Sequence, residues 1–461
     1  MKCDVAIVGA GIAGLSAAEA LTDAGRDVVV LEARDRVGGR TLNTEIGGEP
    51  NELGGQWVGP YQDSMIAILE RLGLELFPTY REGDHVYVDE DGAPRRYAGD
   101  HPPLGEASEK ALEEVDAKLD ALAKELDPEA PWEHPDAEAL DSITLAAWLD
   151  REVDDEIARN LMRSWLAGGF IAKPAHTFSL LQALWMIAGA GGTFELLEPS
   201  QCLASRVVGG SQLVSIRLAE GLGDRVILDS PVDSIEWSED GVVVHSTKAE
   251  VEAERVIVAV PPNLTNSIRF HPPLPGWRQR MTQDLSQGSI IKCLAVYEEP
   301  FWREDGLSGQ GFAPYGLVSE IYDNSPPSGS VGVIVTFLAG EKAESAARML
   351  PEERREAVLE GIAAYLGPRA RDATGFIEVD WAEEEWTRGA YGTSFGPGGL
   401  TRFGEDLRRP VGPIEWACTD ISGVGHIHMD GAIRSGQAAA SACLTEPTTA
   451  LGGSPPPDSN R

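Results

Sequence analysis

The stretch Asp4-Val-Ala-Ile-Val-Gly-Ala-Gly-Ile-Ala-Gly14 decides the fold of this chain. A short apolar run leads into a G-x-G-x-x-G triplet, and an apolar helical pattern follows, so the order is strand, tight turn and helix. Gly9 permits the turn, Gly11 lets the backbone approach a pyrophosphate, and Gly14 allows the helix to pack closely on the strand. The N-terminus of the helix then points at the phosphates. We therefore predict a dinucleotide site at the start of the chain.

A second glycine-rich turn selects the dinucleotide. A predicted strand over residues 27–31 ends in Glu32, whose carboxylate would accept hydrogen bonds from the ribose hydroxyls. Residues 32–41, which include Gly38, Gly39 and Arg40, resemble the extended FAD fingerprint of the large flavoprotein family that contains amine oxidases and phytoene desaturases. No second glycine motif follows a strand as a nicotinamide site would require, and residues 423–425 are interpreted as a loop. The expected electron acceptor is therefore dioxygen or a protein.

Composition and charge restrict the possible partners. The chain has 461 residues, with 74 acidic and 38 basic side chains, and its formal net charge of −36 repels nucleic acid and anionic lipid while attracting a cationic substrate. Five scattered cysteines without a CxxC pair fit a reducing cytoplasm and predict no metal site. No signal peptide is expected, because the first predicted strand already begins near Asp4, and no apolar run reaches the roughly 20 residues that span a bilayer. Residues 445–461 are rich in Pro, Gly, Ser and Thr and are predicted to form a disordered tail.

The pattern of strands and helices predicts an α/β protein with two interleaved domains. A discontinuous Rossmann-like FAD-binding domain is expected over residues 1–80, 205–270 and 381–444. An α+β substrate-binding domain is expected over residues 81–204, which are mostly helical in pattern, and 271–380. Within the latter segment, a mixed sheet is predicted from strands at 290–297, 316–322 and 331–338.

Four further blocks resemble the flavin-containing monoamine oxidase family, in the family's order and over nearly the whole chain. They are the segments 52–59, 208–215 with 223–232, 289–292 with 300–302, and 381–391 with 416–437. Within the family, the chain is most similar to members that oxidise putrescine, through residues 320–324, 386–391 and 416–420. The resemblance implies a monoamine oxidase-like fold and a homodimer in the cytoplasm. It also implies oxidation of a primary amine to an imine, which water converts to an aldehyde and ammonia, while dioxygen becomes hydrogen peroxide.

The glycine turns and the resemblance together give a predicted FAD site. Ala390 occupies the family position of the flavin-linked cysteine, so FAD is expected without a covalent bond. Trp381 is expected beside the flavin ring, although a core tryptophan would give the same pattern. The predicted cofactor contacts are Gly9, Gly11, Ile12, Ala13, Gly14, Glu32, Ala33, Arg34, Gly39, Arg40, Gly55, Gln56, Trp57, Val232, Trp381, Trp386, Thr419, Asp420, Met429 and Ile433.

Three residues are predicted to take part in catalysis. The resemblance places Tyr391 and His428 as two aromatic side chains that flank the reactive face of the flavin, and the alternative for His428 is a packed, hydrogen-bonded imidazole. An apolar aromatic pocket favours the neutral amine, the form with a free lone pair. Lys292 interrupts an apolar strand, where an unpaired charge is costly. The matching lysine of the family holds a water against flavin N5, and the alternative is an edge-strand lysine that extends to solvent.

The substrate pocket is predicted to contain Glu320 and Phe170. In the predicted strand 316–322, alternation places Val318, Glu320 and Tyr322 on one face. A diamine keeps one cationic amine in the pocket, which needs a charged partner. Glu320 stands where the putrescine-oxidising members carry their anchoring glutamate, and the alternative is an exposed strand glutamate.

Three other functions compete with oxidation of a diamine. Closest is a general monoamine oxidase, because pocket shape decides between the two. An FAD-dependent desaturase or isomerase of an apolar substrate shares the FAD fingerprint, but Lys292, Tyr391 and the acidic composition argue against it. A flavin-binding scaffold or redox sensor without turnover is the third. Peroxide production from small amines would separate the last two from an oxidase.

Overall fold

The computed structural model describes residues 1–99 and 102–445. The predicted tail, from residue 446 onward, lies outside the described residues. Within the described residues, no helix is both long and apolar enough to cross a membrane.

The first sheet is built around the glycine turn. Strand β1 (Lys2–Val8) pairs in parallel with strands on both sides, and helix α1 (Ile12–Asp23) begins directly after Gly11. A Cβ atom on Gly14 would lie 2.0 Å from the carbonyl oxygen of Gly9, so only glycine lets the helix approach the turn this closely. In spatial order the sheet contains β10 (Val226–Ile227), β2 (Val28–Leu31), β1, β13 (Glu250–Val258), β12 (Gly241–Ser246), β11 (Val232–Ser238) and β14 (Arg269–His271), with β22 (Ile414–Trp416) also paired to β13. The predicted strand–turn–helix–strand unit is confirmed.

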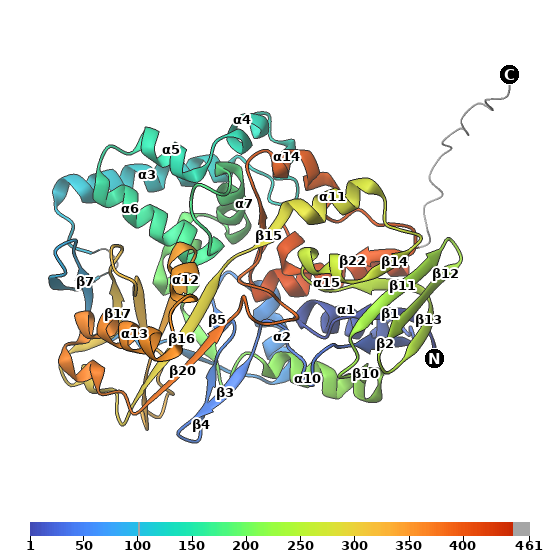
Figure 1. Ribbon diagram of the computed structural model, residues 1–461, viewed down its shortest axis with the longest axis horizontal. Helices are drawn as coiled ribbons and strands as arrows, with labels where there is room; N and C mark the ends of the chain where they lie inside the picture. Colours follow the sequence, from blue (N-terminus) through green and yellow to red (C-terminus); the bar gives the residue numbers. More distant parts are fainter. Residues whose placement is uncertain (100–101, 446–461) are drawn as a thin grey trace.

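Helices from distant parts of the chain cover this sheet. Both α10 (Leu213–Leu222) and α15 (Met429–Leu444) pack against α1, and α2 (Asp63–Leu72) packs against both. Figure 1 shows α1, α2 and α10, from the first half of the chain, beside the C-terminal helix α15. The contact of α1 with α15 is close, because a Cβ atom on Gly436 would lie 2.1 Å from the Ala13 carbonyl oxygen. The C-terminal segment therefore completes the nucleotide fold.

The second sheet is mixed, as predicted. Its order is β20 (Gly375–Asp380), β16 (Ile290–Tyr297), β19 (Gly332–Ala339), β18 (Glu320–Asp323), β17 (Leu307–Phe312), β7 (Asp84–Val88) and β8 (Pro94–Tyr97). Strands β17 and β7 pair in parallel, and the other neighbours are antiparallel. The predicted helical region 81–204 thus begins with two strands, and the chain turns helical after them.

One predicted strand of this sheet is shorter than expected. Residues 316–319 form a turn, and β18 begins only at Glu320, which pairs with Phe312 of β17. Val318 therefore does not share a face with Glu320 and Tyr322. Instead it packs in another cluster beside Tyr365, whose hydroxyl donates to the Val318 carbonyl over 2.7 Å. The alternation prediction is wrong at Val318, because the hairpin loop uses those residues to reverse the chain.

A helical layer stands over one end of the second sheet (Figure 1). It consists of α3 (Glu106–Lys124), α4 (Ala137–Ser142), α5 (Leu145–Glu152), α6 (Glu156–Arg163), the π-helix η2 (Ser164–Ile171), α7 (Leu180–Ala190), α8 (Thr193–Leu197) and α9 (Pro199–Cys202). Small sheets and connecting helices complete the fold, namely β3 (Asn43–Ile46), β4 (Glu49–Glu52), β5 (Trp57–Val58), β6 (Leu76–Pro78), β9 (Ser205–Val207), α11 (Gly276–Asp284), β15 (Leu285–Gln287), α12 (Glu341–Ala346), α13 (Pro351–Leu366), β21 (Thr393–Phe395) and α14 (Gly399–Phe403).

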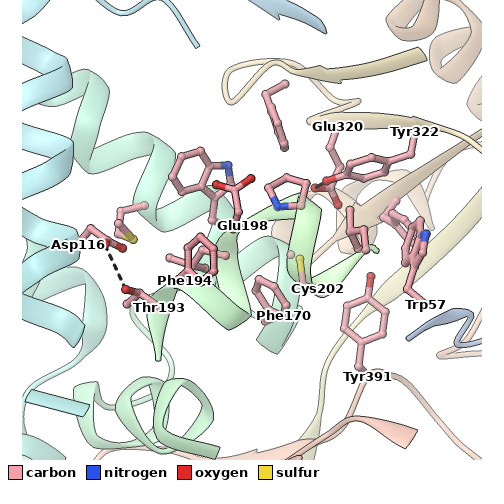
Figure 2. A pocket seen from close by; sticks show the side chains of 18 of the residues that line it. Trp57, Asp116, Phe170, Thr193, Phe194, Glu198, Cys202, Glu320, Tyr322 and Tyr391 are labelled. Carbon is pink, nitrogen blue, oxygen red and sulfur yellow. Dashed lines mark hydrogen bonds between the residues drawn. The ribbon is translucent and has the colours of Figure 1, made fainter. Parts of the chain in front are cut away.

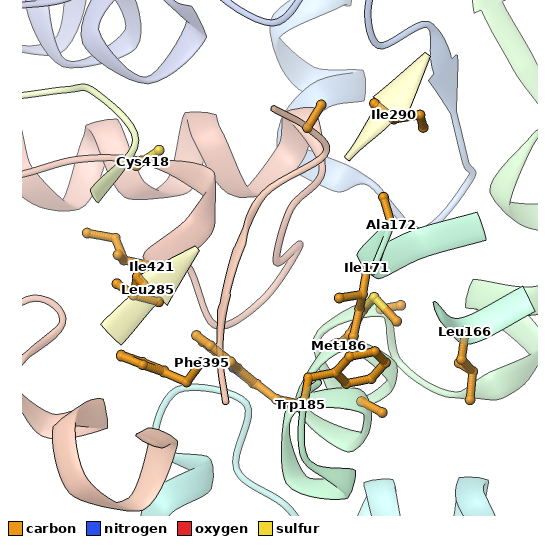
Figure 3. Packing of buried hydrophobic residues seen from close by; sticks show 14 of the residues in the cluster. Leu166, Ile171, Ala172, Trp185, Met186, Leu285, Ile290, Phe395, Cys418 and Ile421 are labelled. Carbon is orange, nitrogen blue, oxygen red and sulfur yellow. The ribbon is translucent and has the colours of Figure 1, made fainter. Parts of the chain in front are cut away.

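The largest buried cluster joins the helical layer to both sheets. Figure 3 shows part of it, with Trp185 and Met186 of α7, Ile171 of η2, Ile290 of β16 and Phe395 of β21. Each large apolar side chain buried here contributes about 1.5–3 kcal/mol. A shared core gives any cavity between these elements fixed walls. The fold is the predicted combination of a Rossmann-like sheet and an α+β part, and the residue boundaries of the two domains stay a prediction.

Candidate active site

A cavity of about 400 Å³ opens beside the first glycine turn. It extends along the carboxyl ends of β1 and β2, where ligands bind in sheets of this kind. The predicted cofactor residues that line it are Gly9, Gly11, Ile12, Ala13, Glu32, Ala33, Arg34, Gly39, Arg40, Gly55, Val232, Trp381, Trp386, Thr419 and Met429. Ala390, where a covalent link would need a thiol, is also part of the wall.

The geometry of this cavity fits FAD. A Cβ atom on Gly11 would have only the Cα of Gly39 near it, at 3.9 Å, so the two glycine turns leave open space at the start of α1. No side chain caps that helix, so its first N–H groups remain available to a phosphate. Glu32 is held by two backbone donors, Ala10 N at 2.7 Å and Arg34 N at 3.0 Å, and its carboxylate faces the cavity as a ribose partner must.

Five predicted cofactor residues do not line this cavity. Gly14 and Ile433 are packed between elements, whereas Gln56 and Trp57 line a neighbouring cavity. Asp420 lies buried behind Arg40, which donates to it over 2.5 Å and to the Tyr391 carbonyl over 2.6 Å.

The charge of Asp420 depends on that neighbour. Burial alone would raise the pKa of Asp420, but the Arg40 charge outweighs it and holds that pKa below its usual value. Asp420 also accepts the Thr393 amide over 2.6 Å. In the structure Asp420 therefore anchors Arg40, and through it the backbone of Tyr391.

A second cavity, of about 510 Å³, shares a wall with the first. Figure 2 shows its two ends, with Asp116 and Thr193 at one and Glu320, Tyr322 and Tyr391 at the other. The residues that line both cavities are Gly54, Gly55, Phe337, Tyr391, Ile427, His428 and Met429. All four residues predicted to meet the substrate from this side, Phe170, Glu320, Tyr391 and His428, line it. A ligand in this cavity would therefore meet a flavin at the shared wall.

Tyr391 and His428 form part of the shared wall. Tyr391 packs against Phe337, with ring centroids 6.3 Å apart and planes at 67°. The Nδ1 of His428 lies 2.8 Å from the carbonyl oxygen of His426, which can only accept, so Nδ1 carries the proton. Burial lowers the pKa of His428, so its imidazole is neutral with a free lone pair on Nε2. His428 is thus hydrogen-bonded and also faces the cavity.

His426 directly follows the predicted loop 423–425 and lines neither cavity. Its ring stacks on Trp185 at a centroid distance of 3.8 Å, and it is buried there. Its role is to pack the loop against α7 and to present its carbonyl to His428.

Glu320 is partly buried and faces the cavity. Its carboxylate accepts the Tyr322 hydroxyl over 2.9 Å, and the Thr336 hydroxyl holds its carbonyl over 2.6 Å. Burial raises the pKa of Glu320, while the Tyr322 hydrogen bond and the Lys342 charge act in the opposite direction. The position differs from that of an exposed strand glutamate, because Glu320 lies among aromatic side chains (Figure 2).

Lys292 is buried in the middle of the second sheet, with 2% of its surface exposed. It lies on β16 between Phe337 of β19 and Val379 of β20, so the alternative of an edge-strand lysine is wrong. Its Nζ donates to the Gly54 carbonyl over 2.8 Å and to Oε1 of Gln56. Burial lowers the pKa of Lys292 to about 7. The negative charge of Glu52 acts to raise this pKa, and the positive charge of Arg206 acts to lower it. Lys292 also lines the nucleotide cavity.

Trp381 combines both roles that its sequence pattern allowed. It is buried in the core, and its indole N–H donates to the Leu53 carbonyl over 3.1 Å. It also lines the nucleotide cavity.

Sequence reasoning missed much of the second cavity. The wall residues that were not named as site residues include Trp165, Phe194, Leu197, Cys202, Phe312, Tyr322 and Phe337. Two of them had a usable signal: Tyr322 was predicted to share a strand face with Glu320, and Phe337 lies on a predicted strand opposite Lys292. The others come from helices and strands whose mutual placement the sequence pattern does not specify.

Comparison with known proteins gives the family of the chain. The family model for flavin containing amine oxidoreductases matches residues 12–444. The chain is 46% identical to putrescine oxidase from Kocuria rosea, over 96% of this chain and 95% of that protein. It is 36% identical to flavin-containing amine oxidase B from Homo sapiens, over 95% of this chain and 85% of that protein.

A solved structure gives the same result. The structure of wild-type putrescine oxidase bound to putrescine superimposes with a TM-score of 0.95 at 48% identity, and the match covers 96% of this chain and 99% of that one. FAD is therefore the cofactor of the protein, and an amine is its substrate. The chain belongs to the flavin-containing amine oxidoreductase family.

Proposed function

We propose that the protein oxidises a primary diamine of the putrescine type with dioxygen. The amine loses two electrons and two protons to give an imine, and dioxygen gains them to give hydrogen peroxide. Water then adds to the imine, which releases ammonia and leaves an aldehyde. The observation that carries the proposal is the carboxylate of Glu320, which lines the cavity beside Tyr322 at the end where Tyr391 lies.

The cavity first binds and orients the substrate. The second amine of a diamine stays cationic, and the Glu320 carboxylate offers it a charge-assisted hydrogen bond. The reacting amine then lies toward the shared wall, between Tyr391 and His428. Aromatic surroundings disfavour the ammonium there and favour the neutral amine. When bound, FAD supplies the two-electron acceptor at that wall.

The neutral imidazole of His428 adds a hydrogen-bond acceptor to this wall. Its Nδ1–H is committed to the His426 carbonyl, so Nε2 is the acceptor that remains. If an N–H of the reacting amine donates to Nε2, the lone pair of the amine nitrogen is held in a fixed direction. Lys292 lines the nucleotide cavity, where its Nζ would hold a water for the step with dioxygen.

Replacing Glu320 tests this proposal. Glu320→Ala should cost putrescine about 2–4 kcal/mol in kcat/KM, the scale of removing one partner from a buried charge pair. Butylamine, which has the same chain length but no second charge, should change little. Glu113→Ala is the matched control, because Glu113 lines the far part of the same cavity. Equal losses for putrescine and butylamine in Glu320→Ala would contradict the proposal.

A general monoamine oxidase is the second candidate. The likeness to human amine oxidase B and the apolar rings of Phe170, Trp165 and Phe312 favour it. A peroxide-coupled screen of diamines, aliphatic monoamines and aryl-ethylamines separates the two, because a wild-type preference for aryl monoamines would select this candidate. The homodimer and the cytoplasmic location implied by the family resemblance stay predictions.

A further inference from the structure

A chain of buried amides leads away from Lys292. Gln56 accepts from Lys292 through Oε1, and its Nε2 donates to Oδ1 of Asn324 over 2.5 Å. Asn324 Nδ2 in turn donates to Oδ1 of Asn51 over 2.5 Å. The three amides are 2%, 0% and 1% exposed, so water does not compete for these bonds.

Backbone groups at the far end fix the direction of every bond in this chain. The Glu52 amide, which can only donate, bonds Oδ1 of Asn51 over 3.1 Å. Asn51 Nδ2 donates to the Asn324 carbonyl, which can only accept, over 3.1 Å. Asn324 must therefore present Nδ2 to Asn51 and Oδ1 to Gln56. Gln56 is left with a single orientation, in which its oxygen faces Lys292.

The far end is also clamped by charge. Arg206 donates to the Asn324 carbonyl over 2.9 Å and forms a buried ion pair with Glu52. Asn324 directly follows β18, the strand that carries Glu320. The chain of amides therefore connects the strand of the proposed anchor to Lys292. Glu52 and Arg206 are the charged groups that act on Lys292, whose other neighbours are the rings of Trp57 and Phe337.

The consequence for Lys292 is a restricted geometry. Its Nζ has two fixed acceptors, the Gly54 carbonyl and the Gln56 oxygen. These two acceptors take two of the three directions around Nζ. In the third direction, an ammonium would present its remaining N–H and a neutral amine would present its lone pair. Because Lys292 lines the nucleotide cavity, that direction is available to a group at the flavin.

We propose that Gln56 is a positioning residue, whose side-chain oxygen holds the Nζ of Lys292 so that the one uncommitted direction of Nζ points toward the flavin. The amide chain keeps Gln56 in this orientation, because the backbone groups of Glu52 and Asn324 fix the direction of its hydrogen bonds. The effect of Gln56 on turnover rests on the proposed role of Lys292 in the dioxygen step. The effect of Gln56 on the position of Lys292 does not depend on that role.

The test measures the proton equilibrium of Lys292 directly in the FAD-loaded protein. Lysine labelled with ¹³C at Cε is titrated by NMR, and the Lys292 signal is assigned by its loss in Lys292→Met. Gln56→Glu places a carboxylate beside Nζ and should raise the Lys292 pKa by about 1 to 3 units. Gln56→Met removes the acceptor of the charged form and should lower it, so the two variants shift in opposite directions.

The matched control is Gln310→Met, because Gln310 is equally buried, on β17, but lines neither cavity. It should leave the Lys292 pKa unchanged. If a Gln56 variant loses FAD, the same titration is carried out on Asn324→Ala. This substitution removes the acceptor that fixes the Gln56 amide, so the amide can turn and the Lys292 pKa should also fall. Unchanged Lys292 titration in the Gln56 variants would overturn the inference.

Stopped-flow oxidation of the reduced enzymes separates this inference from the proposed role of Lys292. The pH midpoint of reoxidation should move with the NMR pKa in each variant. If the NMR pKa moves and the reoxidation midpoint does not, the positioning by Gln56 stands and the role of Lys292 in the dioxygen step fails.

Discussion

The two cavities meet at Tyr391 and His428 but are built in different ways. The nucleotide cavity is centred on backbone groups and small residues at the ends of the adjacent strands β1 and β2, and segments from the rest of the chain complete its wall. The substrate cavity uses large side chains from helices α3, α6, α8 and α9, the π-helix η2 and strands β17, β18 and β19. Substitutions in the nucleotide cavity should therefore reduce stability or the binding of FAD, and substitutions in the substrate cavity should change the substrate preference.

The largest effect is expected in the nucleotide cavity, from Arg40→Ala. The substitution leaves the buried carboxylate of Asp420 without its cationic partner and removes the bond to the Tyr391 carbonyl. The free energy of unfolding, measured by urea denaturation, should fall by about 3–5 kcal/mol. Arg71→Ala is the control, since its ion pair with Glu19 is exposed and is worth only about 0–1 kcal/mol. A loss for Arg40→Ala as small as the control would mean that Asp420 does not depend on this partner.

Lys292→Met tests a lysine that lines the nucleotide cavity but not the substrate cavity. Methionine keeps much of the apolar stem but removes the donor that faces this cavity. Stopped-flow reoxidation by dioxygen should slow by about 10²-fold, the scale of losing one aligned electrostatic group. The Kd of the amine should change far less, because Lys292 does not line the substrate cavity. Reoxidation at the wild-type rate would leave Lys292 with a structural role only.

The pH dependence of substrate preference tests the role of Glu320 in the substrate cavity. Burial raises the pKa of Glu320, so the carboxylate is ionised above that raised pKa and loses its charge as the pH falls through it. Below it, the ratio of kcat/KM for putrescine to that for butylamine should fall by up to about tenfold per pH unit. The ratio cancels the titration of the reacting amine, which both substrates share. A ratio that is constant with pH would remove Glu320 as the anchor.

The smallest effect concerns the link between protein and flavin. Ala390 lines the nucleotide cavity without a thiol, so acid precipitation should release the yellow flavin into the supernatant. Absorbance of the supernatant and of the redissolved pellet gives the two fractions. Flavin retained by the pellet would show a covalent bond and contradict the prediction.

Local patterns were sufficient for the nucleotide cavity because the chemistry there is local. The turn at Gly9, the helix start after Gly11 and the carboxylate of Glu32 all follow from residues that are close in sequence and in space. A reason for Lys292 was also predicted, since an unpaired charge inside an apolar strand is costly, but only the structure removed the alternative of an edge-strand lysine. Alternation failed at Val318, because a period of two cannot reveal that a hairpin loop occupies the first half of an apolar run.

The sequence by itself determined the strand–turn–helix unit, the FAD fingerprint and the residue types at the shared wall. The tertiary structure alone decided which distant rings enclose Glu320, and that Gln56 of one segment meets Lys292 and Asn324 of two others. The physical reason is that backbone propensity and hydrogen-bond sense act between near neighbours in the chain, whereas side-chain contacts across the core depend on how the elements pack. A buried amide has two possible orientations in any sequence, and here only the fixed backbone groups of Glu52 and Asn324 select one.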